Sequence, residues 1–289
     1  MAAPLKATAT SVAEIERELA ALRDDATTDG SNLRTSVMTH LAWVPQEWED
    51  AAQRTLAGLA ERHPSRTILL LPRPDDDDCL EAEATLECFP FGGRSVCAEV
   101  ISVRLGGERA RHPASVVLPL LVADLPVFCR WRGKPAFDAV FDELVGVVDR
   151  LIVDSTEWGD ELAPAYLQLA RRFERTAISD IAWARTERWR RMLAAAWPFE
   201  ARAIRVRGTR AQALLLAGWL QSRLGHELDV EHEPADVLTA VAIDGDAIDA
   251  PPGEAPAPSD LLSDELDRFT RDRAYEDAVR AAGGSEAPE

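Results

Sequence analysis

The spacing of apolar residues switches between a strand period and a helical period in the first third of the chain. A β-branched and apolar stretch at residues 34–44 predicts a strand that ends before Pro45. Residues 46–62 place apolar side chains on one helical face, and the continuous apolar run 66–72 is typical of a buried strand. The order of strand, helix and strand predicts a β-α-β unit.

The next segments extend this sheet. Residues 80–89 alternate strictly between apolar and mostly acidic positions, and residues 95–105 form a further apolar strand after a Phe-Gly-Gly turn, so the two are expected to be neighbours or a hairpin. Short apolar strands at 127–131 and 150–154 are separated by helical segments. Alternating strands and helices predict an α/β fold with a largely parallel, three-layer sheet.

The second half of the chain changes character. Residues 162–197 are helical in pattern, and we expect Ser179 to cap a second helix there. Residues 201–243 then follow the order β-α-β-β, which predicts a second small α/β unit. A Pro-rich acidic stretch follows, with one helix expected at 261–282.

These patterns predict four regions. Residues 1–29 form an N-terminal helix, which Ser11 and Glu14 begin as a capping box. Residues 30–156 form the α/β sheet domain, and residues 157–248 the helical segment with the small α/β unit. The region 249–289 is an acidic linker and tail, which we expect to be dispensable for folding.

The charge of the chain is strongly negative but unevenly distributed. Fifty acidic residues against 32 basic ones give a net charge of −18, so the molecule as a whole should repel nucleic acid and anionic membranes. Residues 171–210 contain eleven arginines and four acids, a local charge of +7 that leaves −25 for the remainder. This segregation favours a basic contact surface for an acidic partner.

The sequence lacks the motifs of several classes of enzyme and cofactor-binding protein. The sequence contains no GxGxxG, GxxxxGK[ST], GxSxG or HExxH pattern, so we expect no nucleotide cofactor, no catalytic residues, no metal and no enzymatic activity. No apolar run reaches the length of a membrane span, and we expect a soluble, cytoplasmic protein. The four cysteines show no CxxC pairing, and we expect them to be reduced and mostly buried.

Three clusters remain as candidate binding residues. His63 and Arg66 stand at the entrance of a buried strand, where Arg66 could hold a phosphate or instead pair with a neighbouring acid. Arg130, Trp131 and Arg132 follow one another at a strand end, where ligand crevices lie in open α/β sheets, although a packed Trp131 is the alternative.

The third cluster lies in the basic helical segment. Its partner-binding candidates are Trp183, Arg185, Arg188 and Arg191. An exposed arginine ridge beside an aromatic residue would suit an acidic protein surface. The alternative is that acids of the same chain neutralise these arginines.

Longer motifs resemble one family. The segments HPSRTILLL, HPASVVLPLLVADLPVFCRWRG, DRLIVDSTEW and ISDIAWARTERWRRMLAAAW are similar, in sequence and in order, to motifs of the OpcA family of glucose-6-phosphate dehydrogenase assembly proteins. The resemblance implies a non-enzymatic partner that binds glucose-6-phosphate dehydrogenase and promotes its active form. The redox-responsive cysteines of cyanobacterial members have no counterpart after Cys129.

Two hypotheses of different classes follow. The first is the binding and activating protein that the resemblance implies, acting in the oxidative pentose phosphate pathway. The second is a phosphosugar-binding enzyme or sensor that uses an anion site at the strand ends near Arg66 and Trp131. Titration of the chain alone with glucose 6-phosphate distinguishes them.

Overall fold

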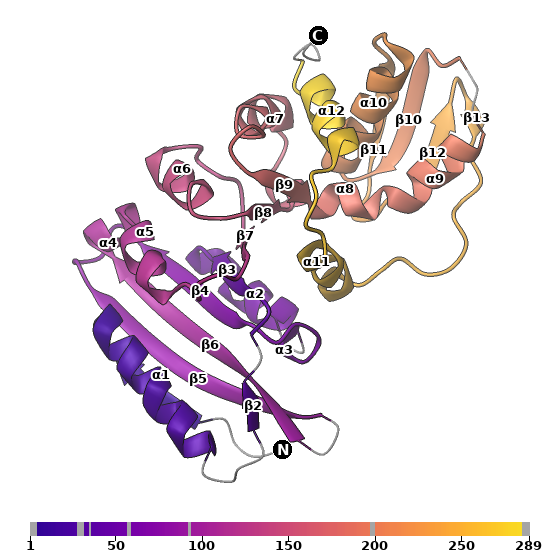
Figure 1. The fold of residues 1–289 in the computed structure, drawn as a ribbon. Coiled ribbons are helices and arrows are strands. Elements are labelled where there is room, and N and C mark those ends of the chain that lie inside the picture. Colours follow the sequence, from indigo (N-terminus) through magenta and orange to yellow (C-terminus); the bar gives the residue numbers. More distant parts are fainter. Residues whose placement is uncertain are drawn as a thin grey trace. The chain divides into compact units, whose positions relative to one another are not determined.

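The structure is a computed structural model and describes residues 5–27, 32–34, 36–56, 59–91, 94–196 and 200–284. Two compact units divide the chain, Met1–Ile152 and Val153–Glu289 (Figure 1). The predicted N-terminal helix belongs to the first unit, and the predicted tail to the second. In the described ranges, no helix is long and apolar enough to cross a membrane.

The first unit is built around a mixed, mostly parallel sheet. Its strands follow the order β1-β5-β6-β4-β3-β7-β8, with β2 beside β6. Strands β6, β4, β3, β7 and β8 run parallel to one another, while β5 is antiparallel to β6 and to β1. The strands are β1 (Leu5–Ala9), β2 (Asn32–Arg34), β3 (Thr39–Trp43), β4 (Arg66–Arg73), β5 (Leu80–Phe91), β6 (Arg94–Gly106), β7 (Val127–Trp131) and β8 (Arg150–Val153). The predicted mixed α/β class with mostly parallel strands is confirmed.

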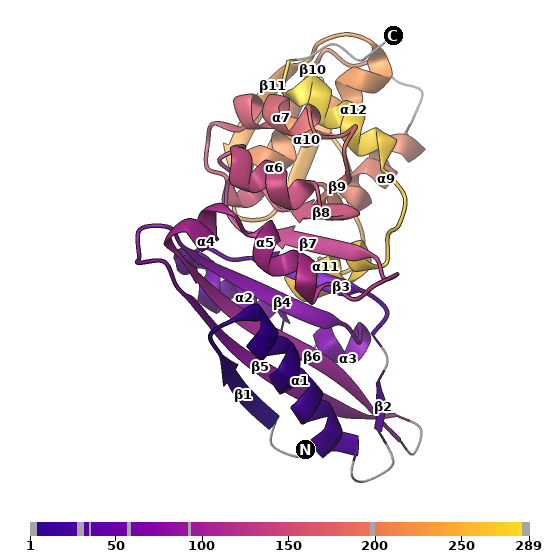
Figure 2. The same cartoon turned by 60° about the vertical axis from the view of Figure 1, so that its left-hand side comes forward.

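Helices lie on both faces of this sheet (Figures 1 and 2). Helix α1 (Val12–Thr27) buries Ile15 and Leu19 completely and lies over the face that carries Arg66. Helix α2 (Glu49–Leu56) packs Ala52 against Leu69, which points to the opposite face because side chains alternate along β4.

The remaining helical segments of this unit are short. The predicted helix 46–62 corresponds to η1 (Gln46–Trp48), α2 and α3 (Leu59–Arg62). The others are α4 (Gly107–Arg111), α5 (Ala114–Val117), η2 (Leu118–Leu120) and α6 (Ala139–Val145). Asp138 begins α6, since its carboxylate accepts the backbone N–H of Phe141 at 3.0 Å.

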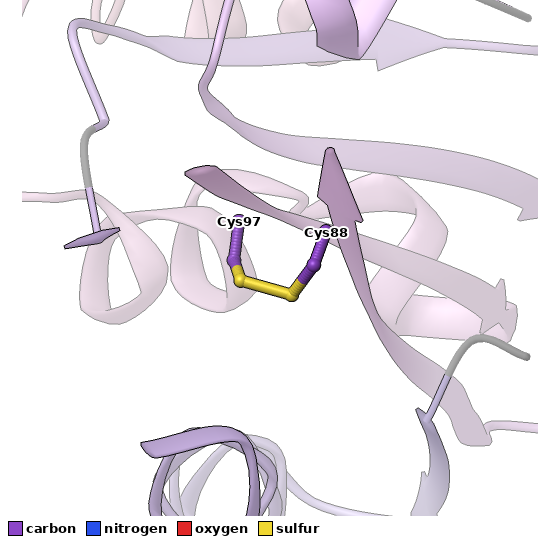
Figure 3. Close-up of a disulfide and its surroundings, with 2 residues drawn as sticks. All are labelled: Cys88 and Cys97. Atoms are coloured by element: carbon purple, nitrogen blue, oxygen red, sulfur yellow. A yellow bond between two sulfur atoms is a disulfide. The ribbon is translucent and has the colours of Figure 1, made fainter. Parts of the chain in front are cut away.

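The cysteines correct one prediction. Cys88 and Cys97 form a disulfide between β5 and β6 (Figure 3), whereas the sequence led us to expect reduced cysteines. The antiparallel register places these two residues directly opposite each other, so the hairpin itself brings the two sulfur atoms together. Cys129 is a buried free thiol, and burial raises its pKa to about 12, which makes it unreactive.

The second unit contains the predicted β-α-β-β segment. Parallel strands β10 (Ala203–Gly208) and β11 (Asp229–Pro234) are joined by α10 (Arg210–Leu224), and the sheet order is β11-β10-β12-β13. Strand β12 (Ala240–Ile243) is antiparallel to β10, and β13 (Asp246–Ala247) continues as a hairpin. Thr209 and Gln212 close a capping box on α10, and the predicted end of this helix at Gly225 is confirmed.

Residues 153–195 contain a strand that the helical pattern did not predict. The order is η3 (Ser155–Glu157), α7 (Leu162–Ala170), β9 (Ala177–Asp180), α8 (Ile181–Arg185) and α9 (Glu187–Ala195). The prediction that Ser179 caps a helix is wrong, because Ser179 lies inside β9. The neighbouring Asp180 is the cap, and its carboxylate accepts the backbone N–H of Ala182 at 2.8 Å.

The acidic tail is part of the second unit. It forms two helices, α11 (Pro258–Leu266) and α12 (Arg273–Ala282), instead of the single predicted helix. Leu266, Tyr275 and Val279 are completely buried, and α12 packs along α10. The expectation of a dispensable tail overlooked Tyr275, whose ring contacts those of Phe173 and Trp183.

Candidate functional site: a buried carboxylate network and the arginine segment

Two aspartates at the carboxyl ends of strands define a polar network in the second unit. Asp154 caps η3 by accepting the backbone N–H of Thr156 at 3.2 Å, and Asp180 caps α8 in the same way. Aspartate suits this position because its short carboxylate accepts the free N–H groups of a first helical turn. The Asp180 carboxylate also accepts the backbone N–H of Ser155 at 3.0 Å, so the two caps are connected.

Neighbouring side chains complete the network. Arg185 donates to the Asp154 carboxylate at 2.8 Å, and the hydroxyl of Tyr166 donates to Ser155 Oγ at 2.9 Å. Asp154, Ser155, Tyr166 and Asp180 are all buried. The polar residues of two motifs that carry the family resemblance, DRLIVDSTEW and ISDIAWAR, therefore meet in one place.

Asp180 is the most perturbed carboxyl group of this network. Burial, and secondarily the charge of Asp154, raise its pKa to about 7, and its hydrogen bonds with Ser155 and Ala182 only partly oppose that rise. Its Oδ1 atom accepts both backbone N–H groups, whereas Oδ2 has no hydrogen-bond partner among the described residues. The hydroxyl of Tyr275, from α12, is likewise buried without a described partner.

The network has the groups of an acid-base site but not the access. Asp180 is completely buried and Asp154 is 4% exposed, so no substrate reaches them in this conformation. Within the described part of the chain, no group of three or more His, Cys, Asp or Glu side chains could hold a metal ion. The arrangement is therefore structural: it fixes the ends of two strands and the start of α8.

Trp183 belongs to the same interior. It is 1% exposed, its Nε1 donates to Asp272 at 2.8 Å, and the guanidinium of Arg190 lies 3.5 Å from the ring centroid. The sequence proposed Trp183 as an aromatic anchor for a partner. Its burial contradicts that role, because the ring offers no exposed surface.

The arginines of the proposed ridge make different contacts. Arg185 is engaged by Asp154, and Arg188 donates to the backbone carbonyl groups of Pro251, Pro252, Gly253 and Glu254. Arg191 is exposed over 74% of its side chain and pairs with Glu187 at 2.6 Å. Groups of the same chain therefore engage all three arginines, as the alternative proposed, and Arg191 is the one of the three whose side chain stays widely exposed.

The cluster after β7 is also packed. Trp131 stacks on Trp43 with ring centroids 4.9 Å apart and meets the edge of Phe141. Arg132 lies over the Trp48 ring at 4.9 Å, and Arg130 donates to the carbonyl oxygen of Trp131. All three residues of the Arg130-Trp131-Arg132 cluster are less than 10% exposed, so an open aromatic surface is not found there.

The predicted anion site at Arg66 is filled by carboxylates of the chain itself. Arg66 donates to Glu99 at 2.8 Å, to Glu16 at 2.9 Å and to the carbonyl oxygen of Leu120 at 2.7 Å. Arg23 binds the other oxygen of Glu99 at 2.7 Å. Burial alone would raise the pKa of Glu99, but the two arginines outweigh it and lower that pKa.

His63, the other residue of the predicted anion site, directly follows α3. Its side chain is buried between α3 and β4. The anion position expected at Arg66 is therefore taken by carboxylates of the same chain, those of Glu99 and Glu16. Sequence reasoning missed Glu99, although the two-residue period of β6 places it on the same face as the buried Ile101 and Val103.

Comparison with known proteins identifies the family. Two protein-family models match the chain: the glucose-6-phosphate dehydrogenase subunit N-terminal domain over residues 57–171 and the corresponding C-terminal domain over residues 176–254. This chain belongs to the OpcA family. The resemblance in the sequence motifs is thereby confirmed.

Curated relatives carry the same name. An OxPP cycle protein OpcA of Synechocystis sp. is 26% identical over 234 residues, which cover 75% of this chain and 48% of that protein. An OpcA protein of Nostoc punctiforme is 28% identical over 183 residues, 57% of this chain and 39% of that protein. This chain thus spans about half or less of the length of these relatives.

Proposed function

We propose that this chain is a non-enzymatic assembly factor and allosteric activator that binds glucose-6-phosphate dehydrogenase and promotes its active form. The match to both domains of a family described as a subunit of that dehydrogenase carries the proposal. The setting is the oxidative pentose phosphate pathway, which the names of the relatives indicate.

The buried network supports a binding role over a catalytic one. The motif residues Asp154 and Asp180 are enclosed, and Arg66, the expected phosphate ligand, is held by Glu99 and Glu16. The phosphosugar-binding alternative therefore loses the residue on which it depended. We therefore place the contact with the partner on the surface of the chain and not at these enclosed residues.

Activation sets a thermodynamic condition. A bound protein shifts the dehydrogenase toward its active conformation or assembly only if it binds that form more tightly than the inactive one. The proposed effect therefore appears as a change in the apparent affinity for glucose 6-phosphate, in the maximal rate, or in both.

The test is a titration of the dehydrogenase of the same organism with this chain. Its rate is measured against glucose 6-phosphate at increasing amounts of the chain, and sedimentation velocity of the mixture reports complex formation and assembly state. We expect activation that saturates at a fixed stoichiometry. A rate and a sedimentation profile that stay unchanged at a large excess of the chain would contradict the proposal.

A further inference from the structure

The arginines of residues 171–210 do not share one surface. Arg172, Arg185, Arg188 and Arg190 bond to groups of the second unit itself. The exposed ones are Arg171, Arg175, Arg191, Arg202, Arg205, Arg207 and Arg210. Among these, Arg205 and Arg207 are two positions apart on β10, so both side chains project from the same face of a sheet.

The sheet β11-β10-β12-β13 has one covered and one open face. Ile204, Val206, Val241 and Ile243 pack with residues of α9 and α10 in a common core. The alternate positions project to the other face, where β10 presents Arg205 and Arg207, β11 presents acids, and β12 and β13 present alanines. Most of these side chains are exposed, and Figure 1 locates the four strands in the second unit.

Charge on the open face is arranged in stripes. Asp229, Glu231 and Glu233 line the edge strand β11, and Arg205 lies 2.6 Å from Glu231 and 3.9 Å from Glu233. Arg207 forms no ion pair with any described residue. The central strand therefore offers one arginine that the described residues leave without an ion pair.

The other side of the arginine stripe is small and neutral. Ala240 lies opposite Arg207 and Ala242 opposite Arg205, and Ala247 continues the row on β13. Alanine is depleted in strands and adds no polar group to a solvent-facing sheet. Because its side chain is short, these positions leave the sheet backbone open to close approach by another protein.

We propose that this open face, with Arg207 at its centre and Ala240, Ala242 and Ala247 beside it, is the surface on which the dehydrogenase docks. The inference rests on the proposed function and names the contact. Charge complementarity defines the partner segment: carboxylates facing Arg207, small or apolar side chains over the alanines, and a basic or neutral side toward the acidic strand β11. The contact thus moves from the helix α9, where the sequence placed it, to the sheet.

The experiment measures the affinity of the dehydrogenase for the full chain by calorimetric titration. Arg207→Glu reverses the central charge, and Ala240→Gln adds neutral bulk to the alanine row. Arg191→Glu and Ala194→Gln are the matched controls, because they make the same changes at exposed positions of α9. Thermal melting of each variant confirms that it is folded.

We expect Arg207→Glu and Ala240→Gln each to weaken binding by about tenfold or more, since a like charge or added bulk at a docked centre opposes association. The two controls should stay within about twofold, because their positions on α9 lie outside the proposed contact. If both sheet variants bind the dehydrogenase as tightly as the wild-type chain does, the proposed surface is wrong, while the proposed function stands. Absence of wild-type binding overturns the function, and this inference with it.

Two other results would place the contact on another element or give this face another occupant. If Arg191→Glu weakens binding and Arg207→Glu does not, the contact is on α9 and the sheet proposal is wrong. Sedimentation of the chain without the dehydrogenase tests a second copy as the occupant: a dimer that Arg207→Glu abolishes would overturn docking of the dehydrogenase there. We expect the same sedimentation coefficient for the wild-type chain and the variant.

Discussion

Gly218 of α10 lies directly against Ala278 of α12, so close that a methyl group on Gly218 would come within 2.3 Å of the Ala278 carbonyl oxygen. A backbone atom cannot move aside as a flexible side chain can, and only glycine allows this distance between the two helices. The contact makes the C-terminal helix an integral part of the second unit.

Gly218→Ala should therefore destabilise the chain, although alanine is the better helix former. The helical preference gains about 1 kcal/mol, whereas forcing an extra methyl group into a packed contact costs typically about 1–3 kcal/mol. Thermal melting checks the expected decrease. Ser222→Ala, at an exposed position of the same helix, is the control and should change the melting temperature little. An equal or raised melting temperature for Gly218→Ala would show that α12 is not docked.

Truncation after Asp249 tests the same docking on a larger scale. It removes α11 and α12 with the buried Leu266, Tyr275 and Val279, and each large apolar side chain contributes about 1.5–3 kcal/mol on burial. We expect a strongly lowered melting temperature or an unfolded second unit. A melting curve like that of the full chain would restore the interpretation of the tail as an independent segment.

Much of the fold was predictable, and the exceptions have common causes. Periodicity predicts the alternation of β5, its hairpin with β6 and the order β10-α10-β11-β12. Gly225 predicts the end of α10, and both signals are local in the sequence. Strand β9 escaped prediction because four residues between helices give no period of their own. Trp131 and Trp183 were proposed as surface anchors, but Trp131 stacks on Trp43 and Trp183 contacts Tyr275. Both partners lie far away in the sequence, and no local pattern reveals them.

The raised pKa of Asp180 predicts that the contribution of this group to the free energy of unfolding decreases as pH rises. The carboxyl group has a folded-state pKa of about 7 against an ordinary value of 3.8, so the folded chain holds the proton more tightly than the unfolded chain. Stability is thus lost between about pH 4 and pH 7, and three pKa units correspond to roughly 4 kcal/mol.

Asp180→Asn should remove this dependence. The amide keeps an oxygen for the N–H groups of Ser155 and Ala182 but does not ionise. Urea denaturation at pH 5 and pH 8 measures the free energy of unfolding of the variant and of the wild-type chain. The difference between the two should shift in favour of the variant at pH 8. Asp264→Asn, at an exposed position of α11, is the control and should show the same difference at both pH values. A constant difference for Asp180→Asn would contradict the elevated pKa.

The disulfide predicts a redox-dependent stability of the β5–β6 hairpin. Cys88 and Cys97 are nine positions apart, and closing so short a loop stabilises the folded state by about 2–3 kcal/mol in the chain-entropy description. Reduction should lower the urea midpoint of the wild-type chain. The Cys88→Ser/Cys97→Ser variant should have a lower midpoint from the start and should not respond to the reductant; a further decrease on reduction would point to other cysteines.

The ion pairs of Arg66 predict a structural, not a ligand-binding, role. Removing one partner of a buried pair costs about 3–5 kcal/mol, so Arg66→Met should lower the melting temperature clearly. Calorimetric titration of the wild-type chain with glucose 6-phosphate should show no binding at this position. Heat that saturates in the wild type but is absent in a folded Arg66→Lys variant would support the phosphosugar alternative.

The bonds from Arg188 to four successive carbonyl groups, Pro251 to Glu254, give the Pro-rich linker a fixed length. A flexible connection tolerates insertions, because doubling its length costs only about 0.6 kcal/mol. Here an added residue would shift every carbonyl past the guanidinium and displace the start of α11. Residues 249–257 therefore act as a spacer whose residue count matters, and a charge reversal at Arg188 would disturb the position of the C-terminal helices before it could report on any partner.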